Sequence, residues 1–96
     1  MEKLQCGQII KSKAGRDQGK VFIIIEMDDE YVYLVDGNLR RLENPKKKKQ
    51  KHVQPTHIII ETIKNKIEKA EKLTNADIRK EMIVYQKDPE NRKEVE

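Results

Sequence analysis

Apolar residues in the first part of the chain form short clusters that turn-forming residues separate. Ile9 and Ile10 lie between polar neighbours and predict a first strand, which the glycine-containing stretch 14–19 ends. The strand expected at 20–27 carries the unbroken apolar run 21–25. Because side chains alternate between the two faces of a strand, this run predicts burial on both faces. A further layer of structure must therefore cover the outside of the sheet.

Further short strands follow the same pattern. Residues 31–35 predict the third strand, Asp36 and Gly37 a tight hairpin turn, and residues 38–42 a short fourth strand. A basic loop is then expected from Asn44 to Val53. Five short strands in roughly fifty residues imply a small barrel.

The pattern becomes helical after Pro55. Ile60, Ile63, Ile67 and Ala70 recur at helical spacing among lysines and glutamates, which predicts an amphipathic helix. Its apolar stripe is the expected cover for the barrel. Residues 57–60 suit either an extended strand or the start of this helix, because β-branched isoleucines do not decide between the two.

A second helix signal begins at Thr74. Asp77 stands at the third helical position, as in a capping box, and predicts a helix from about Asn75 to Gln86. The side chains expected on its buried face are Ile78, Met82 and Tyr85. The predicted fold class is mostly β with C-terminal α. It comprises a barrel over 1–57, a helical extension over 58–86 packing on that barrel, and a flexible tail over 87–96.

Net positive charge is confined to the barrel half of the chain. The 96 residues carry 21 Lys and Arg against 17 Asp and Glu. Residues 1–60 hold 12 basic and 8 acidic side chains, and residues 61–96 hold 9 of each. Within residues 40–52, seven basic side chains face the single acid Glu43, a net charge of +6. Such a density favours binding to phosphate, so nucleic acid is the leading partner.

Catalytic and membrane functions find little support in the sequence. His52 and His57 stand five apart across a proline, Ser12 is the sole serine, and Cys6 is remote from all three. No metal cluster, nucleophile with base or phosphate-cradling glycine loop follows from these spacings. We therefore expect no enzyme activity, no metal and no cofactor.

No apolar run is long enough for a membrane span, and a single cysteine fits a cytoplasmic protein.

The stretch GQIIKSKAGRDQGKV, residues 7–21, resembles the KOW motif of ribosomal proteins and transcription elongation factors. The continuation YLVDG at 33–37, followed by arginines, a proline, lysines and Gln-Pro-Thr at 54–56, is similar to one family in particular. That family is the KOW-containing large-subunit ribosomal proteins of archaea and eukaryotes, with their short bacterial relatives. The resemblance implies an SH3-like barrel, RNA binding and a partner in ribosomal RNA of the large subunit. It also implies contacts with ribosomal proteins, and we expect a monomer when the protein is free.

The same resemblance gives Gly15 and Gly19 as motif glycines and places Arg16 and Lys20 at the loop tip that meets RNA or protein. The candidate RNA-binding residues are the basic ones of this turn and of the basic loop: Lys13, Arg16, Lys20, Arg40, Arg41, Lys46, Lys47, Lys48, Lys49 and Lys51. We expect the turn from Arg16 to Lys20 and the basic segment from Arg40 to Lys51 to act as a two-part clamp on the RNA backbone.

Several alternatives stay open. The barrel could instead be a protein-binding adaptor of the transcription or translation machinery, or a DNA-binding accessory protein that uses the same charge. Tyr31 and Tyr33 share a strand face and could stack on bases, although rim packing is the commoner role of such a pair. One of Arg40 and Arg41 could pair with Asp36 or Glu43 instead of reaching RNA. The acidic cluster 28–30 could bind Mg²⁺, but a solvated turn is the simpler interpretation.

Overall fold

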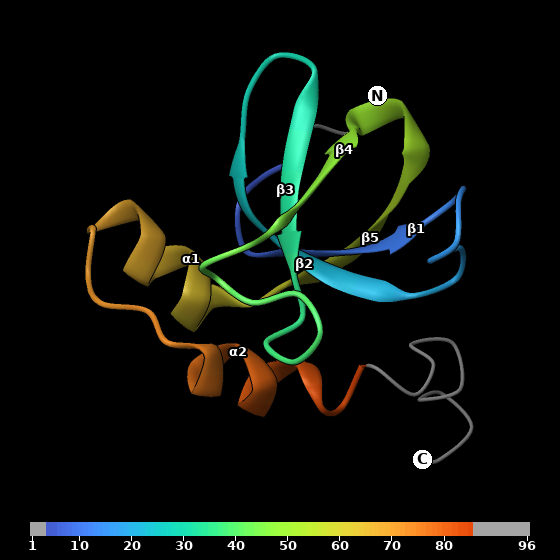
Figure 1. Ribbon diagram of the computed structural model, residues 1–96. Coiled ribbons are helices and arrows are strands. Elements are labelled where there is room, and N and C mark those ends of the chain that lie inside the picture. Colours follow the sequence, from blue (N-terminus) through green and yellow to red (C-terminus); the bar gives the residue numbers. More distant parts are fainter. Residues whose placement is uncertain (1–3, 86–96) are drawn as a thin grey trace.

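Five antiparallel strands form one sheet in the computed structural model, which describes residues 4–85 (Figure 1). The strands are β1 (Gln8–Ser12), β2 (Val21–Met27), β3 (Tyr31–Val35), β4 (Lys46–Lys49) and β5 (Val53–Ile59). Two helices follow, α1 (Glu61–Glu68) and α2 (Asn75–Met82). The fold is therefore mostly β with C-terminal α, as the sequence predicts.

The sheet curls into a barrel because its two outermost strands are consecutive in the chain. The strand order is β4-β3-β2-β1-β5, so β4 and β5 lie at opposite edges. Only the three-residue 3-10 turn η1 (Gln50–His52) separates them in sequence. The four peptide steps from Lys49 to Val53 span at most about 13–14 Å, whereas the edges of a flat five-stranded sheet lie about 19 Å apart. The edges must therefore approach each other, which produces the small SH3-like barrel that the KOW resemblance implies.

One of two apolar clusters fills the inside of the barrel. Its buried members come from every strand except β4 and are Ile10, Phe22, Ile24, Val32, Leu34 and Val53. The residues of β4 are all lysines, so this strand adds no apolar side chain to the interior.

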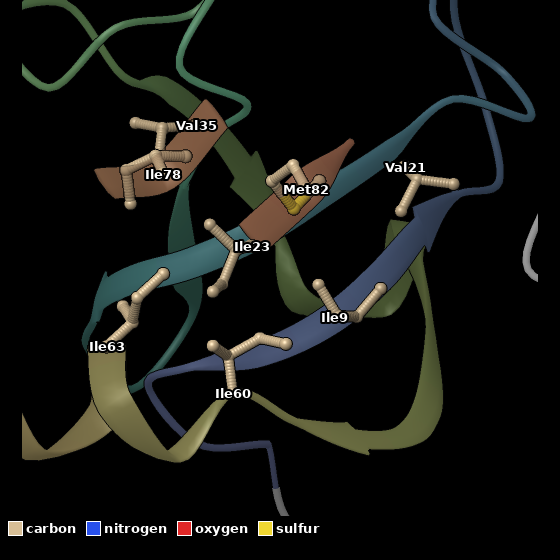
Figure 2. Close-up of a cluster of buried hydrophobic side chains, with 8 residues drawn as sticks. All are labelled: Ile9, Val21, Ile23, Val35, Ile60, Ile63, Ile78 and Met82. Atoms are coloured by element: carbon tan, nitrogen blue, oxygen red, sulfur yellow. The ribbon is translucent and has the colours of Figure 1, made fainter. Parts of the chain in front are cut away.

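The second cluster lies on the outer face of the sheet, beneath the two helices (Figure 2). It joins the strand residues Ile9, Val21, Ile23 and Val35 to the helical-region residues Ile60, Ile63, Ile78 and Met82. Successive residues of β2 thus point alternately to the two clusters, and Val21 to Ile24 are all buried. The predicted burial of β2 on both faces is confirmed. Each fully buried isoleucine contributes about 1.5–3 kcal/mol to folding.

The start of α1 decides between the two alternatives that the sequence left open for residues 57–60, and its end corrects the sequence prediction. Residues 57–59 belong to β5, and Ile60 is the N-cap of α1, its N–H donating to the Gly7 carbonyl at 2.8 Å. At the other end, Ala70 lies outside the helix with φ of +55°. The N–H of Glu71 donates to the Lys66 carbonyl at 2.8 Å. The N–H of Ala70 donates to the Ile67 carbonyl at 3.2 Å. This is a Schellman motif, with alanine in the position that glycine normally takes.

The capping box of α2 is present. The Thr74 side chain accepts a hydrogen bond from the Asp77 N–H, and the Asp77 carboxylate accepts one from the Thr74 N–H, both at 3.1 Å. The helix ends at Met82 and not at Gln86, because the exposed β-branched residues Ile83 and Val84 gain no burial from continuing it. Residues 83–85 form a turn, and the tail expected over 87–96 lies outside the described residues.

The fourth strand lies at Lys46–Lys49, and the prediction of a strand at 38–42 followed by a basic loop is wrong. The Asp36 carboxylate explains the difference, because its Oδ1 accepts the N–H groups of Asn38 at 2.8 Å and Arg40 at 2.9 Å. The Arg40 carbonyl in turn accepts the N–H groups of Asp36 and Gly37. These bonds fold residues 36–40 into a wide turn in place of the two-residue hairpin that the Asp-Gly pair predicts.

Packing against α2 holds this turn in place. A Cβ on Gly37 would lie 2.8 Å from the Arg79 nitrogen and from the Asn75 carbonyl oxygen of that helix, so only glycine permits the approach. Arg79 Nη1 donates to the Gly37 carbonyl at 2.8 Å, and the Leu42 N–H donates to Asn75 Oδ1 at 2.8 Å.

A buried carboxylate ties the turn between β1 and β2 to strand β4. Asp17 Oδ1 lies 2.9 Å from the Ser12 hydroxyl and 3.2 Å from Lys48 Nζ, and its Oδ2 lies 3.3 Å from Lys46 Nζ. Oδ2 accepts no hydrogen bond of good geometry, so its contact with Lys46 is electrostatic. Burial by itself raises the pKa of Asp17, but the hydrogen bonds from Ser12 and Lys48 and the close approach of the Lys46 ammonium outweigh it and hold the pKa below its usual value.

Replacing Ala70 with glycine should stabilise the protein. An L-residue in the left-handed conformation costs about 1–2 kcal/mol, and glycine avoids most of that cost. We expect Ala70→Gly to raise the free energy of unfolding by about 0.5–1 kcal/mol in urea titrations. The matched control, Ala76→Gly within α2, should lower it by a similar amount. A destabilising Ala70→Gly would contradict the observed backbone geometry.

Replacing Asp17 with asparagine should destabilise the protein in a pH-dependent way. The change leaves Lys48, whose side chain is 10% exposed, beside a neutral amide, and we expect a loss of about 1–3 kcal/mol at pH 7. Because the pKa of Asp17 is lowered by folding, its charge stabilises the protein above the unfolded-state pKa. The difference between variant and wild type should therefore shrink as pH falls through the folded-state pKa.

Urea titrations between pH 7 and pH 3 measure this effect. Asp29→Asn, at an exposed position of the turn between β2 and β3, is the matched control and should leave stability unchanged. An Asp17→Asn deficit that stayed constant down to pH 3 would show that Asp17 stabilises by its shape and not by its charge.

Candidate nucleic-acid interface

The four consecutive lysines of β4 are divided by the pleat of the strand. Lys46 and Lys48 stand opposite Leu34 and Val32 of β3 and share their inward face. Lys47 and Lys49 stand opposite Tyr33 and Tyr31 and share the outward face. The four lysines are consecutive in sequence, but they therefore project from two different faces of the sheet.

The inward pair is engaged within the protein. Lys46 and Lys48 both approach Asp17, and Lys48 Nζ also donates to the Ala14 carbonyl at 2.9 Å. Their charged ends neutralise a buried carboxylate, and the Lys48 side chain is only 10% exposed. Lys48 is thus a structural residue, and Lys46 is partly one.

The outward pair lies beside the tyrosines of β3. Lys47 Nζ sits 4.3 Å from the centroid of the Tyr31 ring, a cation–π contact. Lys49 Nζ lies 3.9 Å from a Glu30 carboxylate oxygen, in an exposed ion pair that contributes little to stability. The Tyr33 hydroxyl donates to Asp28 Oδ2 at 3.4 Å. Both tyrosines therefore make side-chain contacts within the protein, and Lys47 lies over the Tyr31 ring.

The acidic cluster 28–30 forms a turn. Asp28 Oδ1 accepts the N–H groups of Tyr31 at 2.7 Å and Glu30 at 2.9 Å. These backbone hydrogen bonds lower the pKa of Asp28, and the bond from Tyr31 has the larger effect. Among residues 4–85, no three histidine, cysteine, aspartate or glutamate side chains gather closely enough to hold a metal ion.

The turn 13–20 presents basic side chains to solvent. The motif glycines Gly15 and Gly19 have φ of +88° and +87°, values that side-chain-bearing residues rarely adopt. Hydrogen bonds close the turn from Gly19 N–H to the Ser12 carbonyl at 2.8 Å and from Lys20 N–H to the Asp17 carbonyl at 2.9 Å. Arg16 and Lys20 are exposed at its tip.

A surface pocket of about 220 Å³ brings this turn together with the turn 36–40 and the start of β4. Its lining residues are Arg16, Asp17, Lys20, Phe22, Asp36, Leu39, Arg40 and Lys46. Four of the predicted RNA-binding residues, separated by up to thirty positions, thus meet at one place. Within the described part of the chain, no carboxylate forms an ion pair with Arg16, Lys20 or Arg40.

The other candidates lie elsewhere. Arg41 Nε donates to the Asn38 carbonyl at 3.2 Å, so Arg40 is the member of the arginine pair that lines the pocket. Lys13 and Lys51 are exposed on neighbouring segments, since the Lys13 N–H donates to the carbonyl of His52, next to Lys51. Lys47 and Lys49 do not line the pocket.

Sequence reasoning missed three residues of this pocket. Leu39 is 77% exposed, although it is a large apolar residue in an otherwise polar turn, and that contrast was visible in the sequence. Asp17 is the sole acid of the KOW-like turn, and Asp36 was assigned to a hairpin. Phe22 was predicted as a core residue, which it is at 3% exposure, and it also reaches the pocket.

Comparison with known proteins identifies a relative. No family model matches the chain. Large ribosomal subunit protein eL14 of Methanococcus vannielii is 34% identical over 56 residues, which cover 58% of this chain and 68% of the relative. Neither α1 nor α2 has the length and apolar content of a membrane-crossing helix. With its KOW-like turn, its five-stranded barrel and this similarity, the chain belongs to the eL14 family of large ribosomal subunit proteins.

Proposed function

We propose that this protein binds RNA of the large ribosomal subunit through its basic barrel surface and has no catalytic role. Membership of the eL14 family implies a ribosomal protein-like, non-enzymatic role. The observation that supports RNA contact is the pocket where Arg16, Lys20 and Arg40 converge, because none of the three forms an ion pair with a carboxylate of residues 4–85. On this proposal the protein works in the cytoplasm, is a monomer when free, and has ribosomal RNA and neighbouring ribosomal proteins as its partners.

The electrostatics support a clamp on the RNA backbone. The turn 13–20 and the turn 36–40 stand on either side of the pocket, and each supplies a guanidinium that can grip phosphate through two hydrogen bonds. Lys47 and Lys49 extend the basic surface along β4. Five cations in contact with phosphate give a slope of about −3.5 to −4.5 for log affinity against log salt concentration.

Neutralising the tip of the KOW-like turn should reduce this slope. Arg16→Gln combined with Lys20→Gln removes two exposed cations, and we expect the slope to fall in magnitude by about 1.4–1.8 with no change in melting temperature. Filter binding to large-subunit ribosomal RNA across a salt series measures it. The control, Lys69→Gln with Lys72→Gln near the end of α1, removes the same charge at exposed positions away from the pocket and should leave the slope unchanged.

Two results would contradict the proposal. One is an equal loss of slope in both double variants, because net charge alone would then explain binding. The other is equal affinity for duplex DNA and folded RNA, which would favour a DNA-binding accessory protein. Substitution of all four β4 lysines is a poorer test, since Lys46 and Lys48 also neutralise Asp17 and their loss mixes folding with binding.

Sedimentation of the tagged protein from cell lysate tests the ribosomal part of the proposal. We expect it to migrate with the large subunit at low salt and to dissociate at high salt, because phosphate contacts are screened. Migration as free protein at every salt concentration would contradict a ribosomal role. Retention on a protein complex after ribonuclease treatment would instead favour an adaptor.

A further inference from the structure

We infer that the pocket between the turns 13–20 and 36–40 holds a single unpaired nucleotide of the bound RNA. This inference rests on the proposed function and adds the kind of RNA that the protein prefers. It depends on four observations: the size of the pocket, the cations around it, one exposed leucine, and the rigidity of the turn that carries that leucine.

The size of the pocket limits its occupant to a small group. Its volume of about 220 Å³ is below the roughly 300–1,000 Å³ of pockets that enclose drug-sized ligands. An RNA duplex is far too wide to enter and would only lie across the opening. A base that has left its stack, with its own phosphate at the rim, matches the available space.

The charges favour a nucleotide over an uncharged group. Arg16, Lys20, Arg40 and Lys46 line the pocket against the two carboxylates Asp17 and Asp36, so four minus two leaves a net charge of +2. Both carboxylates are already engaged: Asp17 by Lys46 and Lys48, and Asp36 Oδ1 by two backbone N–H groups. The guanidinium planes of the two arginines can bind phosphate or stack on a base, and both modes are common in the recognition of unpaired RNA.

Leu39 supplies an apolar surface that folding does not explain. It is 77% exposed and belongs to neither of the two apolar clusters. Phe22, a member of the barrel cluster with 3% of its surface exposed, also lines the pocket. A base packed against Leu39 would remove apolar surface from water, and a bare phosphate would not.

The turn that carries Leu39 is held rigidly before any ligand arrives. Asp36 Oδ1 accepts the N–H groups of Asn38 and Arg40, which flank Leu39 in sequence. Gly37 packs directly on α2, and Arg79 donates to its carbonyl at 2.8 Å. Binding to a pre-organised site loses little free energy to the ordering of the protein. A single nucleotide can therefore produce a measurable preference for RNA that contains an unpaired base.

Two RNA duplexes of identical sequence test the inference, one fully paired and one with a single bulged adenosine. The wild-type protein should bind the bulged duplex about five- to tenfold more tightly, and Leu39→Ser should reduce this preference to less than about twofold while leaving affinity for the paired duplex unchanged. Ile83→Ser is the matched control. Ile83 is also a large exposed apolar residue, at 67%, but lies outside the pocket lining, so its replacement should preserve the preference.

The outcomes separate this inference from the proposed function. Equal binding of both duplexes by the wild type, or equal weakening of both by Leu39→Ser, would overturn the nucleotide pocket and leave RNA binding standing. Failure to bind either duplex or large-subunit ribosomal RNA would overturn the proposed function and the inference with it. A fluorescent adenosine analogue at the bulge gives a second readout, because its emission should change on binding to wild type and not to Leu39→Ser.

Discussion

Strand β2 is apolar on both faces, and the arrangement of the rest of the protein depends on that constraint. Phe22 and Ile24 turn inward and are buried by the curl of the sheet, whereas Val21 and Ile23 turn outward and would face water without the helices. Residues of α1 and α2, which lie beside the barrel (Figure 1), pack against these outward side chains and bury them. A barrel this small has little other apolar surface with which to offset the loss of chain entropy.

The docking of the helices also shapes the candidate RNA site. The helix α2 approaches the backbone of Gly37 so closely that it fixes the turn 36–40, and this turn presents Leu39 and Arg40 to the pocket. On the opposite side, Asp17 joins the KOW-like turn to β4 through Lys46 and Lys48. The two sides of the pocket are therefore held by core packing and by a buried ion cluster, respectively. Lys46 belongs both to this ion cluster and to the pocket lining, so its substitution would change stability and binding together.

The sequence predicted more of the fold than of the site. The sequence predicted the burial of β2 on both faces, the capping box at Thr74 and the apolar helical spacing that includes Ile63. Each of these features can be recognised from residues that are close in the chain. The fourth strand was misplaced because a polar turn of five residues and a lysine strand carry no apolar alternation. Their conformations depend on the Asp36 side chain and on pairing with β3.

By itself the sequence determined a basic, mostly β barrel with a helical cover, because the spacing of apolar and charged residues is a property of the chain alone. Only the tertiary structure decided which cations face outward. Pairing with β3 sends Lys46 and Lys48 toward Asp17 and leaves Lys47 and Lys49 outside. Only the folded barrel brings Arg16 and Arg40 to one pocket. The net charge follows from the sequence alone. Which side chains neutralise each charge depends on contacts between residues that lie far apart in sequence.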